Sequence, residues 1–255
     1  MKHQAADAIA ERPMPDWAAV ARIPIRDNHE PLVPCGLSDG RIRVYPAYYQ
    51  LGVPGALPDC HLREGVYERL LAAAQSLPKG VRLVLLDGWR PFAVQQYLFE
   101  TLNDILAKQR PELSPSRRLA WARELVAPPS FEADHPSPHL TGGAVDLTLC
   151  DEAGRLLPMG SRFDEATARA HTAYFEARTN LSADERVMRD NRRLLYQTMA
   201  SVGFSNLPSE WWHYDFGDQL WADAHGEAQA CYGATRVQTL AQRWSEQLAG
   251  GEDLQ

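Results

Sequence analysis

Two histidines and one aspartate, drawn from two separate stretches of the sequence, carry the donor atoms of a zinc site. His139 and Asp146 lie seven residues apart in a glycine-containing stretch, and His213 lies in a later aromatic stretch. Zinc accepts imidazole nitrogen and carboxylate oxygen as ligands, and three protein ligands with one open position are typical of a catalytic site. Glu210 has no ligand role in this arrangement, so its carboxylate is free to transfer protons. These residue types predict a single catalytic zinc ion held by His139, Asp146 and His213.

Each of these residues also has an ordinary structural interpretation. A single histidine is more often hydrogen-bonded at the surface or in the core than bound to a metal. Asp146 is harder to explain in that way, because an unpaired carboxylate in an apolar run is costly to bury. His135 lies four residues before His139. A fourth protein ligand would close the open position, so we leave His135 out of the predicted site.

Arg90 supplies a positive charge at the end of a predicted strand. It follows the apolar run Val81–Leu86 within the stretch Asp87-Gly88-Trp89-Arg90-Pro91. A guanidinium fixed at the end of a buried strand can bind a carboxylate or stabilise an oxyanion. A structural salt bridge with Asp87 or another acid is an equally good interpretation from the sequence alone.

Hydrophobic periodicity predicts the elements that position these groups. Helices are predicted at about residues 63–77, 92–109, 115–126, 183–200 and 235–248. Strands are predicted at about residues 41–45, 81–86, 144–149 and 210–216. Since residues three apart on a regular strand face opposite sides, Glu210 must lie in a bend before the strand that carries His213. The Pro- and Gly-rich stretch 46–55 is expected to be a loop, and the tyrosines in and beside it to cover the core with their hydroxyls in water.

The composition fits a globular domain of mixed class. The 255 residues are 45% hydrophobic, which is enough for a sizeable core. We expect an α+β single domain over residues 21–249, with a small central antiparallel or mixed sheet flanked by helices. Residues 1–20 are expected to form a flexible N-terminal arm, and residues 250–255 a frayed C-terminus.

Charge, cysteines and hydropathy argue against several other classes. The net charge of −7 argues against a nucleic-acid binder, which needs a basic face. The four scattered cysteines predict reduced thiols rather than a cysteine-based zinc cluster. No apolar leader segment and no apolar run of about 18 residues occurs, so we expect no membrane span and a cytoplasmic location. The sequence does not indicate an oligomeric state.

Three stretches, in the same order along the chain, resemble the D-alanyl-D-alanine dipeptidases, which are VanX-type M15 zinc peptidases. They are Asp87–Pro91, the stretch Ser137–Leu149 with the pattern S-x-H-x-x-G-G-A-V-D, and Glu210-Trp211-Trp212-His213-Tyr214. The resemblance runs from about Arg41 to Phe216. It implies the fold that D,D-peptidases share with hedgehog signalling domains.

The resemblance also implies an activity and a set of roles. The implied activity is zinc-dependent hydrolysis of a small D,D-dipeptide, D-Ala-D-Ala, to two D-alanines. The implied roles are zinc binding by His139, Asp146 and His213, general base catalysis by Glu210, stabilisation of the transition state by Arg90, and contacts to the ends of the dipeptide by Ser137 and Asp164.

Two other functions fit the same residues. The first is a D,D- or L,D-carboxypeptidase that trims peptidoglycan peptides, and the lack of an export signal argues against it. The second is a non-catalytic zinc-bearing binding domain, as in hedgehog proteins. The presence of Glu210 and Arg90 makes this second alternative less favoured.

Overall fold

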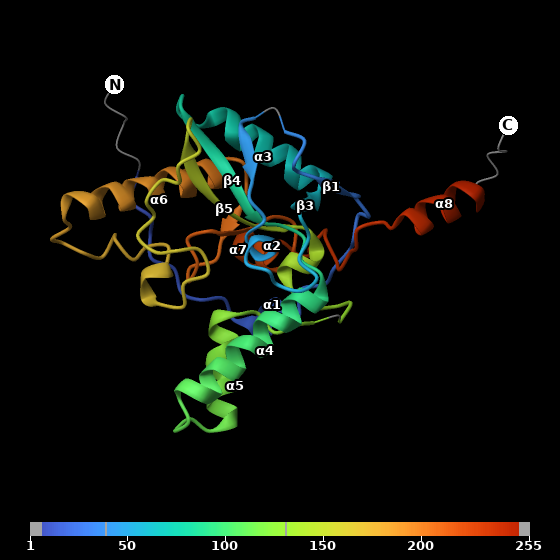
Figure 1. Ribbon diagram of the computed structural model, residues 1–255, viewed down its shortest axis with the longest axis horizontal. Helices are drawn as coiled ribbons and strands as arrows, with labels where there is room; N and C mark the ends of the chain where they lie inside the picture. Colours follow the sequence, from blue (N-terminus) through green and yellow to red (C-terminus); the bar gives the residue numbers. More distant parts are fainter. Residues whose placement is uncertain (1–6, 39, 131, 250–255) are drawn as a thin grey trace.

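A five-stranded mixed sheet lies at the centre of the fold (Figure 1), within the residues that the structure describes, 7–38, 40–130 and 132–249. In this computed structural model the strands follow the order β2 (Ile42–Val44), β4 (Val81–Asp87), β5 (Ala144–Asp151), β7 (His213–Asp215) and β6 (Ser205–Asn206). Strands β2 and β4 are parallel, and the other neighbouring pairs are antiparallel. A second, two-stranded antiparallel sheet joins β1 (Leu32–Pro34) to β3 (His61–Arg63).

Helices occupy most of the connections between the strands. They are α1 (Trp17–Val20), α2 (Ala47–Gln50), α3 (Glu64–Ser76), α4 (Phe92–Gln109), α5 (Pro115–Leu125), α6 (Ala183–Ser201), α7 (Gln219–His225) and α8 (Leu240–Ala249), with 3-10 turns η1 (Pro138–Thr141) and η2 (Ala168–Ala170). The α4–α5 hairpin extends away from the sheet, and α8 projects from the body of the molecule (Figure 1). Within the described part of the chain, none of these helices combines the length and the apolar character that a membrane crossing requires.

Strand β5 separates the hydrophobic core from the polar side of the sheet, because side chains along a strand alternate between two faces. Val145, Leu147 and Leu149 are fully buried and pack in one cluster with residues of α3 and α6. Asp146 has the opposite parity and therefore lies on the other face. Its cross-strand partner in β7 is His213, and residues directly opposite in an antiparallel pair share a face. The sheet register thus brings two of the predicted ligands together.

The α+β class and the mixed sheet are confirmed, and helices α3 to α6 end within one residue of their predicted limits. Two other expectations are wrong. The stretch 46–55 contains the one-turn helix α2, which is too short to show helical periodicity. The last helix begins at Leu240 rather than at residue 235. The Thr235 amide donates to the Leu140 carbonyl, and the Thr235 carbonyl accepts from Trp89 Nε1, so neither group is available for a helical hydrogen bond.

The described part of the predicted arm, residues 7–20, lies against the domain. The amide of Ile9 donates to Glu176 Oε1 at 3.3 Å, and the side chain of Gln197 donates to the Asp7 carbonyl at 2.8 Å. The flexible arm, the domain limits and the cytoplasmic location stay predictions. The predicted frayed C-terminus, 250–255, lies outside the described residues.

All four cysteines are free thiols, as expected for a reduced protein.

Ser182 and Glu185 form a capping box at the start of α6. The Glu185 amide donates to Ser182 Oγ at 3.2 Å, and the Ser182 amide donates to Glu185 Oε2 at 3.0 Å. Ser182→Ala removes the first bond, so we expect the free energy of unfolding to fall by about 0.5–2 kcal/mol. Urea unfolding measures the change, and Ser182→Asp, which keeps an accepting oxygen, is the control. An unchanged midpoint in Ser182→Ala would mean that this cap contributes no stability.

Candidate active site

His139 is carried by the 3-10 turn η1, directly before β5. Gly142 ends this turn with a φ of 73°, a left-handed conformation that glycine adopts without strain. A Cβ at this position would lie 2.5 Å from the Leu32 side chain, so the turn also needs the absence of a side chain. The turn sets His139 beside the beginning of β5, where the side chain of Asp146 emerges.

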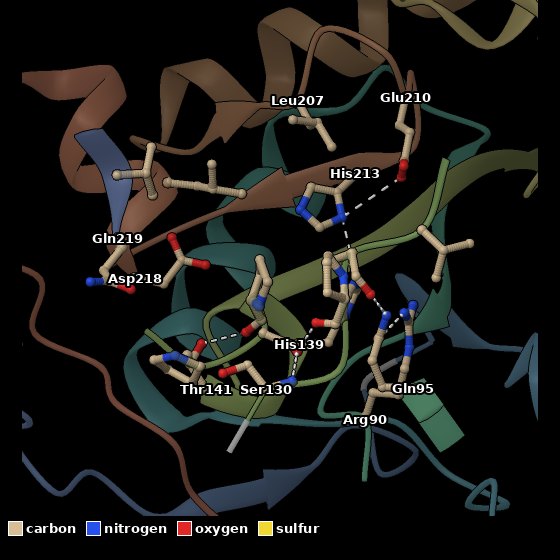
Figure 2. Close-up of a pocket in the computed structure, with 18 of the residues that line it drawn as sticks. Arg90, Gln95, Ser130, His139, Thr141, Leu207, Glu210, His213, Asp218 and Gln219 are labelled. Atoms are coloured by element: carbon tan, nitrogen blue, oxygen red, sulfur yellow. Dashed lines mark hydrogen bonds and ion pairs between the residues drawn. The ribbon is translucent and has the colours of Figure 1, made fainter. Parts of the chain in front are cut away.

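The three predicted ligands, His139, Asp146 and His213, form a buried cluster, and Figure 2 shows the two histidines at its centre. The His139 Nε2 atom is 3.2 Å from His213 Nδ1 and 3.4 Å from Asp146 Oδ2. The His213 Nδ1 atom is 3.1 Å from Asp146 Oδ1. Tetrahedral zinc with bonds of about 2.0–2.2 Å holds its ligand atoms roughly 3.3–3.6 Å apart. The donor types and their spacing therefore fit a zinc ion.

The second nitrogen of each imidazole already has a hydrogen-bond partner. His139 Nδ1 donates to the Gly88 carbonyl at 2.8 Å, and His213 Nε2 donates to Asp215 Oδ1 at 2.8 Å. Such bonds fix the ring orientation and the tautomer of metal-binding histidines, and they leave His139 Nε2 and His213 Nδ1 available as ligands. Burial alone would raise the pKa of Asp146, but His139 and His213 hold that pKa well below its usual range. The carboxylate in the cluster therefore stays ionised.

The guanidinium of Arg90 borders the cluster and is held by several neighbours. Its Nε donates to Asp87 Oδ2 at 2.7 Å, its Nη1 to Gln95 Oε1 at 2.7 Å, and its Nη2 to Asp146 Oδ2 at 3.2 Å. The ring of Tyr48 covers it, with 4.8 Å between the ring centroid and Arg90 Cζ. Arg90 therefore forms the salt bridge with Asp87 that one interpretation of the sequence expected, and it also lies beside the cluster. The salt bridge thus fixes a positive charge beside Asp146.

Glu210 lies in a turn before β7, so the bend expected from the sequence is present. Its amide donates to the Leu207 carbonyl at 3.0 Å, and its own carbonyl accepts from the His213 amide at 3.3 Å. The strand begins only at His213 and is shorter than the predicted 210–216. The Glu210 carboxylate points toward His213 and is 4.0 Å from Nδ1 (Figure 2). Burial raises the pKa of Glu210 to about 8, which suits proton exchange near neutral pH.

Asp164 and Ser137 reach the same cavity from different loops. Asp164 has a φ of 60°, an uncommon value for a residue with a side chain, and it accepts a hydrogen bond from Tyr48. Asp164 is an exposed residue that borders the cavity, and desolvation of its carboxyl group by the surrounding protein raises its pKa. The Ser137 hydroxyl donates to the Pro128 carbonyl at 3.0 Å and accepts from the Ser130 amide at 3.1 Å. That hydroxyl is therefore engaged with its own neighbouring loop.

All of these predicted residues border one cavity of about 470 Å³. Tyr48 borders it as well and is only 5% exposed, so the expectation that the tyrosines cover the core with their hydroxyls in water is wrong for Tyr48. Tyr45 and Tyr49 are exposed. No sequence signal separates Tyr48 from these neighbours, because a one-turn helix is too short to show a buried face.

Asp215 is a further site residue that the sequence analysis missed. It lies two residues after His213, and residues two apart on a strand share a face, so this spacing was a usable signal. Its carboxylate is buried and bonds the imidazole of His213. The carboxylate therefore orients the ring from the side opposite the cluster.

Asp215→Asn should weaken zinc binding by about 10–100-fold, because the substitution removes the charge that supports the His213 imidazole. Competition with a chromogenic chelator measures the Kd for zinc. Asp223→Asn, at an exposed position on α7, is the matched control. Equal zinc affinity in Asp215→Asn and in the unaltered protein would contradict this role for Asp215.

Comparison with known proteins identifies relatives over most of the chain. The profile of the M15 peptidase family described as D-Ala-D-Ala dipeptidase matches residues 60–231. A D-alanyl-D-alanine dipeptidase from Synechocystis sp. is 35% identical over 216 residues, which cover 78% of this chain and 87% of the relative. A D-alanyl-D-alanine dipeptidase from Enterococcus faecium is 32% identical over 164 residues, covering 62% of this chain and 74% of the relative.

Solved structures give more distant matches. VanYB in complex with D-alanine-D-alanine aligns with a TM-score of 0.41 at 16% identity, over 76% of this chain and 85% of that chain. The D,D-dipeptidase VanXYg in complex with a D-Ala-D-Ala phosphinate analogue aligns with a TM-score of 0.36 at 18% identity, over 81% of this chain and 68% of that chain. Family membership therefore rests on the sequence matches.

Proposed function

This chain belongs to the D-Ala-D-Ala dipeptidase family of M15 peptidases and is a metallopeptidase, and we propose that it hydrolyses D-Ala-D-Ala to two D-alanines with a single zinc ion. The observation that carries this proposal is the buried cluster of His139, Asp146 and His213, whose ligand atoms are spaced for a tetrahedral ion. Three protein ligands leave one position for substrate or solvent, and the cluster borders a cavity large enough for a dipeptide.

Glu210 is the general base of the proposed reaction. When bound, zinc would acidify water and polarise the scissile carbonyl. The Glu210 carboxylate accepts a proton from the attacking water and later delivers it to the nitrogen of the leaving amine. Its position near His213 but outside the ligand set supports this role.

Arg90 stabilises the negative charge that develops on the carbonyl oxygen when water adds to the scissile carbon. Its bonds to Asp87 and Gln95 hold the guanidinium before substrate arrives, so little reorganisation is needed during the reaction. The ring of Tyr48 shields the same group from solvent on one side, which strengthens its electrostatic effect.

Asp164 and Ser137 receive the two ends of the dipeptide in this proposal. Asp164 presents a carboxylate at the cavity wall, where it pairs with the free ammonium group of the substrate. Ser137 acts at the carboxylate end by holding the Pro128–Ser130 loop through its hydroxyl. The proposed site therefore requires both a free ammonium group and a free carboxylate one residue to either side of the scissile bond, and this double requirement restricts it to dipeptides.

A peptide panel tests the proposed substrate directly. Zinc-loaded protein should release D-alanine from D-Ala-D-Ala but not from N-acetyl-D-Ala-D-Ala, because acetylation removes the charge that Asp164 pairs with. Chiral chromatography of the products measures the release. A folded, metal-replete sample that leaves D-Ala-D-Ala intact would rule the dipeptidase activity out. Faster release from a wall pentapeptide than from the dipeptide would favour the carboxypeptidase alternative instead.

A further inference from the structure

The turn Gly88–Arg90 and the 3-10 turn η1 carry two groups that have to act together, Arg90 and His139, and both are labelled in Figure 2. Two direct bonds join these turns. The Gly88 carbonyl accepts from His139 Nδ1 at 2.8 Å, and the Arg90 amide donates to the His139 carbonyl at 3.1 Å. Because both bonds end on His139, they do not join the two turns at a second residue of η1.

A third link between the two turns passes through a residue that is distant along the chain. The Trp89 Nε1 atom donates to the Thr235 carbonyl at 3.0 Å. The Thr235 amide in turn donates to the Leu140 carbonyl at 3.0 Å. The backbone of Thr235 therefore bridges the neighbour of Arg90 in one turn and the neighbour of His139 in the other.

We call residues Gly233–Thr235 the C-terminal strap, and the side chain of Arg63 holds its first residue. Arg63 Nη2 donates to the Gly233 carbonyl at 3.0 Å. The same arginine binds the end of η1, because its Nε donates to the Thr141 carbonyl at 2.8 Å and its amide donates to the Gly142 carbonyl at 3.0 Å. Arg63 is only 1% exposed. The strap and η1 are therefore anchored on one buried residue at the end of β3.

The strap completes a set of bonds that fixes η1 in place. Arg90, Thr235 and Arg63 together donate to the four consecutive carbonyls of residues 139–142. A displacement of about 1 Å in a catalytic group can cost roughly 10²-fold in rate, so the place of Arg90 relative to the zinc cluster matters. The strap lies beyond residues 60–231, which match the family profile. This part of the chain thus contributes to the geometry of the site from outside the matched region.

We propose that Trp89 and the C-terminal strap are positioning elements for Arg90, which they hold at a fixed place relative to His139 through the backbone of Thr235. This inference rests on the proposed function, in which Arg90 meets the negative charge that develops on the carbonyl oxygen. Trp89 does not border the cavity that receives the substrate, so it acts through Arg90. Because Arg90 acts on the transition state, loss of the bridge should lower kcat rather than raise KM.

Trp89→Phe removes the indole donor and keeps an aromatic ring. In the zinc-loaded protein its kcat for D-Ala-D-Ala should fall by about 10–100-fold, while KM and the Kd for zinc, measured by chelator competition, stay the same. Trp221→Phe is the matched control and should keep kcat, because Trp221 Nε1 also donates to a backbone carbonyl, that of Gly203 at 2.8 Å, and Trp221 does not border the cavity.

Equal kcat values in Trp89→Phe and Trp221→Phe would overturn the inference and leave the proposed function standing. Loss of zinc affinity in Trp89→Phe that accounts for the lost activity would also overturn it, because the bridge would then act on the metal site and not on Arg90. No hydrolysis of D-Ala-D-Ala by the unaltered, zinc-loaded protein would overturn both the proposed function and the inference.

A double-mutant cycle shows whether Trp89 acts through Arg90. In an Arg90→Lys background, Trp89→Phe should lower the residual kcat by less than about twofold, because no fixed guanidinium is left to misplace. Thr235→Pro removes the amide that binds the Leu140 carbonyl and should also lower kcat, and Thr235→Ala, which keeps both backbone groups, should rescue it. The same fold loss from Trp89→Phe in both backgrounds, or an unchanged kcat in folded Thr235→Pro, would overturn the inference.

Discussion

Glu210→Gln should abolish measurable hydrolysis of D-Ala-D-Ala while the zinc content of the protein stays unchanged. The Glu210 carboxylate is 4.0 Å from His213 Nδ1, so it reaches the reaction centre without belonging to the ligand cluster. Glutamine has nearly the same shape but cannot take up a proton at neutral pH. Loss of a general base typically costs about 10²–10⁴ in rate. The effect should therefore appear in kcat rather than in metal binding.

The measurement combines kcat with a metal analysis of the same sample. Glu227→Gln, at an exposed position after α7, controls for the loss of one carboxylate and should retain both zinc and activity. Wild-type kcat in Glu210→Gln would remove Glu210 from the mechanism. Loss of zinc together with activity would instead place Glu210 among the ligands.

Removal of the metal should eliminate hydrolysis and lower the Tm, and added zinc should restore both. An ion that binds only the folded protein stabilises it by mass action, by about 2.7 kcal/mol at a free zinc concentration of roughly 100 times Kd. The cluster is buried and includes the ionised carboxylate of Asp146. Removal of the ion therefore leaves two imidazoles and a carboxylate packed together without the cation that they bind. Activity and thermal unfolding are followed during titration with a chelator and then with zinc.

Two single substitutions separate the ligand role from a general effect of losing a histidine. His139→Ala should lose zinc, because its Nε2 is one of the three clustered donors. His135→Ala should keep zinc, since His135 is an exposed residue that pairs with Asp134 outside the cluster. Full activity of the chelated protein, or zinc retention by His139→Ala, would contradict the proposed centre.

The residues of the candidate cluster could be identified from the sequence, because their types and their immediate sequence neighbours already indicate metal binding. Asp146 interrupts an apolar run, and a buried carboxylate needs a partner whatever the fold. The need for a bend before His213 followed from strand geometry alone, and the structure contains the turn. The convergence itself depends on the register of β5 with β7, which no local pattern specifies.

Tyr48 and Trp17 could not be identified as cavity residues from the sequence, because only tertiary contacts bring them to the cavity. Tyr48 lies in a helix of a single turn, and its ring is directed by Arg90 and Phe163. Trp17 borders the cavity, and Gln219, which is distant along the chain, bonds the Ile23 carbonyl in the segment that follows α1. A sequence pattern indicates which face of a helix or strand is buried, but it does not indicate which other element packs on that face.

The most direct test of the central claim is a crystal structure of the zinc-loaded protein with anomalous data collected on both sides of the zinc absorption edge. The proposed centre predicts one strong anomalous peak per chain, at about 2.0–2.2 Å from His139 Nε2, His213 Nδ1 and an Asp146 carboxylate oxygen. Zinc bound at any other set of side chains, with these three directed elsewhere, would contradict it.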